Sequence, residues 1–203
     1  MVSNDNEKCK NEINQQAEIA ILILAPILIV FLLFIKWIII LLYSKEFIGI
    51  VTMVQWAALG MFFKGVSWAI GFIFLAKGAS KTFFWNELAS SVYMLILNVS
   101  GYHYGGLTGL GISYLISYFI HYIQRHWVSR NLYSFDLDKN LIRIFLIQLI
   151  YLVFCFVLIN FLPALYAYTI GIIFCFLSIR FSWIELNRLI GINELIRKRF
   201  LKK

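Results

Sequence analysis

The sequence predicts an all-α fold: a polytopic membrane helix bundle with six transmembrane helices and with both chain ends in the cytoplasm (N-in/C-in). Three observations predict it, namely the composition, six long apolar stretches and the distribution of Lys and Arg. Of the 203 residues, 62% are hydrophobic and 14% are charged. Soluble domains are about 45–50% apolar and about 25% charged, so this chain has too few polar side chains to cover a surface that faces water. We therefore expect lipid to surround much of the protein.

The six predicted spans follow one another along most of the chain. A helix needs roughly 20 apolar residues to cross a hydrocarbon layer of about 30 Å. Stretches of this kind lie at 18–43, 50–76, 82–102, 107–124, 141–162 and 164–184. None of them alternates apolar and polar residues as an outer-membrane barrel strand does, so the pattern favours helices over a barrel.

The segments outside the spans complete the predicted organisation. Residues 1–17 are polar and lack the features of a cleavable signal peptide, so we expect a cytoplasmic N-terminal segment. Residues 18–186 are expected to form the bundle, and residues 187–203 a basic cytoplasmic tail. Within this tail, apolar residues recur at helical spacing over 192–200. That spacing suits either a helix lying on an anionic membrane surface or a stop-transfer tail that only fixes orientation.

The charges of the loops alternate as the positive-inside rule requires. Basic residues gather in the second and fourth loops, which contain Lys77 and Lys81, and Arg125, Arg130, Lys139 and Arg143. The other loops, at 44–47, at 101–106 and at Pro163, have no excess of positive charge. We expect the first set on the cytoplasmic side, together with both chain ends, and the second set on the outer side.

Neither the net charge of +8 nor the histidines and cysteines indicate a separate chemistry. Topology explains the basic residues, and no soluble basic domain is present to bind nucleic acid. The three cysteines lack the spacing of a zinc site or a disulfide framework. His103 lies in an outward turn, whereas His121 and His126 lie near the inner face, and we interpret His121 with Arg125 as an interface anchor. No catalytic or phosphate-loop motif is present, so we predict neither an enzyme nor a cofactor or metal site.

Ionisable residues inside the spans are the candidate functional residues, because each costs at least about 2.5–3.5 kcal/mol to insert. Lys64 is the deepest, at least about 18 Å from each end of its span at about 1.5 Å per residue. It either faces a hydrated path and binds an anionic head group, or forms a buried pair or a snorkelling contact. Glu87, one turn into the next span, either pairs with Lys64 or is solvated at the cytoplasmic face. Lys36 and Arg180 are interpreted as snorkelling anchors.

Four stretches, taken in order, resemble a known family of membrane proteins. At 13–20, 41–47, 71–78 and 106–114 the chain reads INQQAEIA, LLYSKEF, GFIFLAKG and GLTGLGISY. Their order and spacing resemble the O-antigen and lipid-linked oligosaccharide flippases, the polysaccharide-transporter branch of the superfamily that includes the MATE exporters. The similarity covers residues 13–130, and the last two spans match only as generic apolar helices.

The resemblance implies a function and a position within a larger assembly. Members have two six-helix lobes around a central cavity, often followed by two extra helices, and this chain would match the last four helices of the second lobe plus the extra pair. It would translocate undecaprenyl-diphosphate-linked oligosaccharide across the bacterial inner membrane for O-antigen and lipopolysaccharide biosynthesis, with Lys64 and Glu87 contacting substrate. The partners would be this lipid-linked oligosaccharide, membrane lipids and a second polypeptide that supplies the missing lobe. The alternative is a non-transporting membrane interaction protein or a truncated remnant.

Overall fold

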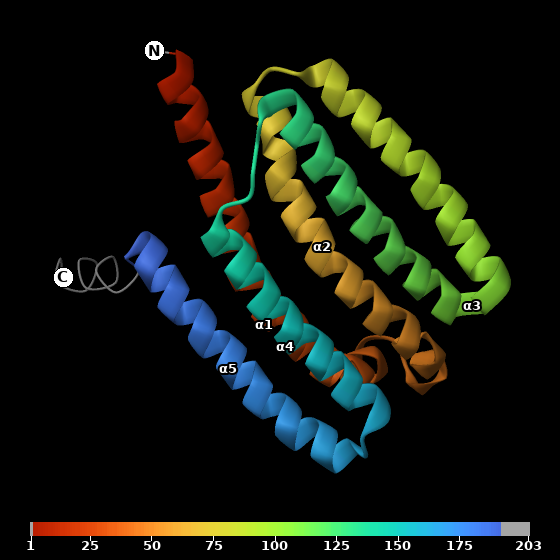
Figure 1. Ribbon diagram of the computed structural model, residues 1–203. Helices are drawn as coiled ribbons and strands as arrows, with labels where there is room; N and C mark the ends of the chain where they lie inside the picture. Colours follow the sequence, from red (N-terminus) through yellow and green to blue (C-terminus); the bar gives the residue numbers. More distant parts are fainter. Residues whose placement is uncertain (1, 192–203) are drawn as a thin grey trace.

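The computed structural model describes residues 2–191 as helices joined by short connections, with no strand in this range (Figure 1). The elements are α1 (Val2–Leu42), the 3-10 helix η1 (Lys45–Ile50), α2 (Val51–Ala76), α3 (Ser80–Tyr133), α4 (Lys139–Phe161) and α5 (Ala164–Ile190). Five of the helices are long and apolar enough to cross a membrane. The prediction of an all-helical fold is confirmed for the described residues, and the five apolar helices fit a membrane protein. The predicted apolar periodicity over 192–200 and most of the basic tail lie outside the described residues.

Helix α1 begins at Val2, well before the predicted start of the first span at residue 18. The polar N-terminal residues are therefore part of the same helix as the first apolar stretch. One face of this extension is buried, since Ile13 is 4% and Ala17 0% exposed. Asn14 holds it in place, because its Nδ2 donates to the Asp136 carbonyl and its Oδ1 accepts from the Asp138 backbone N–H. Packing against the connection before α4 thus extends the helix beyond its apolar run.

Helix α3 spans 54 residues in two helical halves, and the chain reverses direction between them at Gly106, whose φ and ψ are not helical. Its two halves lie side by side in Figure 1. Three side-chain contacts join the two halves, at positions progressively closer to Gly106: Asn86 with Gln124, Tyr93 with His121, and Asn98 with Ser113. The sequence predicted two spans with a turn over 101–106, whereas helical structure continues to Gly105 and one residue makes the reversal.

Alanine at Gly106 is expected to destabilise the fold, whereas alanine at Gly105 is not. Gly106 has φ 56° and ψ −141°, a conformation that costs other residues on the order of 1–3 kcal/mol. Gly105 is helical, and a Cβ added there meets nothing within 4 Å. Unfolding of both variants in SDS-containing mixed micelles checks this. A Gly106→Ala variant as stable as Gly105→Ala would contradict the geometry of the reversal.

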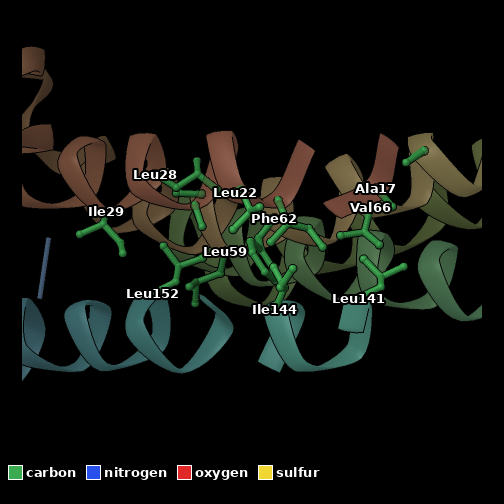
Figure 2. Close-up of a cluster of buried hydrophobic side chains, with 14 of the residues drawn as sticks. Ala17, Leu22, Leu28, Ile29, Leu59, Phe62, Val66, Leu141, Ile144 and Leu152 are labelled. Atoms are coloured by element: carbon green, nitrogen blue, oxygen red, sulfur yellow. The ribbon is translucent and has the colours of Figure 1, made fainter. Parts of the chain in front are cut away.

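The core forms where α1, α2 and α4 meet (Figure 2). Leu22 and Ile29 of α1, Phe62 of α2 and Ile144 and Leu152 of α4 are each at most 1% exposed. Helix α2 packs against α1 and against the second half of α3. Helix α4 contacts α1, α2 and α5, and α5 packs against α1 and α4. Outer faces are apolar instead of polar: Trp37, Trp85 and Trp127 are 61–65% exposed, as suits side chains that meet lipid or its interface.

The bundle has two chemically different ends. One end, here called the basic end, holds the connections 77–79 and 134–138 and the last turn of α5. There Arg143 and Arg188 both contact Glu185, and Asn140 donates to Glu18. The opposite end, here called the Pro163 end, holds η1, the reversal at Gly106 and the turn between α4 and α5.

Candidate functional site

A buried polar stripe runs along the second half of α3. It contains residues spaced four apart in the sequence, each at most 5% exposed: Ser113, Ser117, His121, Arg125 and Ser129. Residues at this spacing share one face of a helix, and here that face turns toward α2 and toward the first half of α3. Polar groups at membrane depth need partners inside the protein. Within the stripe Ser113, His121 and Arg125 have such partners, whereas the hydroxyls of Ser117 and Ser129 are buried without a hydrogen bond in the described structure.

Arg125 is the only cation in that stripe and is held by three kinds of contact. Its Nη2 forms an ion pair with Oε1 of Glu87, and its Nη1 donates to the Ser67 carbonyl at 3.2 Å. Its guanidinium also lies over the Phe83 ring, with Cζ 5.7 Å from the ring centroid. The Arg125 side chain is 4% exposed and that of Glu87 is 40% exposed. A desolvated cation is thus paired with a carboxylate that remains accessible.

Gly71 of α2 makes room for this guanidinium. A Cβ built at Gly71 would lie 1.5 Å from Nη1 of Arg125. No side chain larger than hydrogen fits there unless Arg125 moves. Helix α2 therefore provides both the space at Gly71 and the Ser67 carbonyl that the guanidinium requires.

Lys64 lies on the same side of α2, with its ammonium on aromatic faces. Nζ is 5.0 Å from the ring centroid of Tyr118 and 5.7 Å from that of Trp68. Rings at this distance attract a cation but do not neutralise its charge. Within residues 2–191, no carboxylate forms an ion pair with Lys64. This lysine is partly buried, and its ammonium group has no carboxylate partner in the described part of the chain.

Trp68 connects the lysine with the ion pair. Its ring lies under Lys64, and it also lines a cavity of about 190 Å³ between α2 and α3 together with Gly71, Phe83, Glu87 and Arg125. Lys64, Trp68, Glu87, Tyr118 and Arg125 are here called the α2–α3 site. Two cations and one carboxylate give the site a formal charge of +1, and the arrangement suits an anion.

The structure places both sequence-predicted residues at this interface but does not pair them. Glu87 bonds Arg125 instead of Lys64, and it is not simply solvated. The interpretation of His121 and Arg125 as an interface anchor is wrong, because both side chains are buried inside the bundle and each residue is 3% exposed. The missed signal was the four-residue polar period from Ser113 to Ser129, which predicts one buried face once it is read as a stripe.

The other buried ion pairs lie at the basic end, where Arg143 and Arg188 contact the buried Glu185. Among the described residues, no group of three His, Cys, Asp or Glu side chains could hold a metal ion. Cys155 and Cys175 are buried thiols in α4 and α5, and Lys36 and Arg180 are exposed near opposite ends of the bundle. The α2–α3 site is thus the strongest candidate for anion binding at membrane depth. Comparison with protein-family models, with curated proteins and with solved structures found no match.

Proposed function

We propose that this chain forms part of a membrane transporter that moves undecaprenyl-diphosphate-linked oligosaccharide across the bacterial inner membrane during O-antigen or other surface polysaccharide biosynthesis. The observation that supports it is Lys64, a charged side chain in the middle of an apolar helix without a carboxylate partner in the described part of the chain. A charged side chain inside the membrane raises the free energy of insertion, and such residues are found mostly at functional sites.

The chemistry of the α2–α3 site suits a diphosphate. Lys64 offers a compact positive charge, and Arg125 offers a planar fork of N–H donors that matches phosphate oxygens. Glu87 is 40% exposed and can be displaced from the guanidinium by a competing anion. Because the surroundings are apolar, each of these interactions is stronger than it would be in water.

The proposed function requires a membrane topology. We propose six crossings, with α3 contributing two because it reverses at Gly106, and with the basic end in the cytoplasm. The Lys and Arg residues near the basic end support this orientation through the positive-inside rule. In this topology Glu87 and Arg125 lie toward the cytoplasmic leaflet and Lys64 lies deeper, so a head group entering from inside meets the ion pair before the lysine.

A transport path also requires a second wall. We propose that a second lobe faces the α2–α3 site and completes the cavity, as a separate polypeptide or as another part of a larger protein. The lipid-exposed flank of α3 supports this arrangement, because this helix packs mainly against α2 and leaves its apolar outer face uncovered.

Replacing Lys64 with alanine is expected to slow translocation of the lipid-linked oligosaccharide by about tenfold or more, the effect of losing one charge-assisted contact. The measurement is flux of fluorescent lipid-linked sugar in vesicles that contain the complete assembly. Lys45→Ala removes the same charge from the exposed η1 and serves as the control. Unchanged flux in Lys64→Ala at normal insertion would favour the alternative, a non-transporting membrane interaction protein.

A further inference from the structure

A second cavity, of about 350 Å³, opens at the Pro163 end between α1, α2, α4 and α5. Its wall differs from the apolar interior because polar side chains from all four helices reach it: Lys36, Thr52, Gln55, Asn160 and Tyr168. Neither the α2–α3 site nor the proposed transport step uses these residues.

Gln55 is the most informative member of this wall. It is 5% exposed and it lines the cavity. Within residues 2–191 its side-chain amide makes no hydrogen bond, whereas the buried amide of Gln148 in α4 is bonded on both sides, by Ser178 and Ser182. Buried amides in folded proteins nearly always have partners, so an unpaired one directed at a cavity indicates a ligand or solvent that completes it.

The remaining groups define which ligand would fit. Among the residues that the structure describes, Lys36 is the only charged one lining the cavity, and no acidic one lines it. Tyr168 accepts a hydrogen bond from Trp37 Nε1 at 3.1 Å, which leaves its own O–H free to donate. Asn160 donates Nδ2 to the Phe156 carbonyl, which leaves Oδ1 free to accept. The wall thus offers a cation for an anion, together with donors and acceptors in the mixture that hydroxyl groups require.

We propose that this cavity, here called the Pro163 cavity, binds a phosphate ester whose alcohol part carries free hydroxyls, as glycerol phosphate head groups do. Lys36 holds the phosphate, and Gln55, Asn160 and Tyr168 bond the hydroxyls. The same chemistry occurs in a phosphatidylglycerol head group and in a soluble glycerol phosphate. This site is independent of the transport proposed above, because it lies at the other end of the bundle and shares no residue with the α2–α3 site.

The test is equilibrium binding to the full chain in a neutral detergent, measured by calorimetry. Three probes are titrated: short-chain phosphatidylglycerol, short-chain phosphatidylcholine and glycerol 3-phosphate. We expect saturable binding of phosphatidylglycerol, with Kd raised about tenfold or more in Lys36→Gln and in Gln55→Leu. The matched control is Lys45→Gln, which removes the same charge at the same end of the molecule but does not line the cavity.

Each outcome either identifies the source of the ligand or contradicts the proposed site. Saturable binding of glycerol 3-phosphate as well would show that the head group alone is recognised, and binding of phosphatidylglycerol only would assign the site to lipid. Phosphatidylcholine has the phosphate but neither the hydroxyls nor the net charge, so binding equal to that of phosphatidylglycerol would overturn the proposal. Absence of saturable binding, or an equal loss in Lys45→Gln, would overturn it too.

Discussion

Replacing Glu87 with alanine is expected to lower the free energy of unfolding by about 3–5 kcal/mol, the usual cost of leaving a buried charge without its partner. The reason is the burial of the other partner. Arg125 is 4% exposed, and without Glu87 its guanidinium keeps the Ser67 carbonyl and the Phe83 ring but no counter-charge. Its Nε is already buried without a hydrogen-bond partner in the described structure. The measurement is unfolding of the purified chain in SDS-containing mixed micelles.

A double variant distinguishes the ion pair from a general loss of packing. Glu87→Ala with Arg125→Met removes both charges and replaces the arginine by an apolar chain of similar reach, and it should recover most of the lost stability. Glu46→Ala removes an exposed carboxylate from η1 and should change stability little. If the double variant were no more stable than Glu87→Ala alone, the unpaired guanidinium would not be the cause.

The parts of the fold that depend on the composition of one stretch of sequence were predictable. The parts that depend on packing between distant stretches were less so. Apolar stretches long enough for a bilayer give helices, because every backbone polar group at that depth must bond within its own segment. The starts and ends of the helices depend on contacts instead. Nothing local in residues 2–17 shows that α1 extends to Val2, since that extension is stabilised by Asn14 bonding a connection more than a hundred residues away.

The candidate site shows the same division. Lys64 was identifiable because a charge in the middle of an apolar run is anomalous whatever surrounds it. Arg125 was not, because it lies beyond the last apolar residues of its predicted span, where a charge normally reaches water. Its burial follows from the reversal at Gly106, which brings Glu87 beside it, and from the absence of a side chain at Gly71. These contacts form between helices, so the sequence of one segment alone does not reveal them.

Replacing Gly71 with alanine is expected to destabilise the fold although alanine is the better helix former. The new methyl group would lie 1.5 Å from Nη1 of Arg125, so the guanidinium must leave the position in which it bonds Glu87 and Ser67. Weakening of these contacts costs on the order of 1–3 kcal/mol, and alanine gains ~1 kcal/mol over glycine in a helix interior, so the net cost is at most about 2 kcal/mol.

Measuring Gly71→Ala with and without Arg125 shows whether the clash with the guanidinium causes the loss of stability. In an Arg125→Met chain the methyl group meets no guanidinium, so the same substitution should be neutral or slightly stabilising. Gly49→Ala, where an added Cβ meets nothing within 4 Å, controls for the change of residue type. Equal destabilisation by Gly71→Ala in both backgrounds would mean that Gly71 is required for the approach of the helix backbones. If the loss of stability disappears when Arg125 is absent, Gly71 is needed to make room for the buried guanidinium.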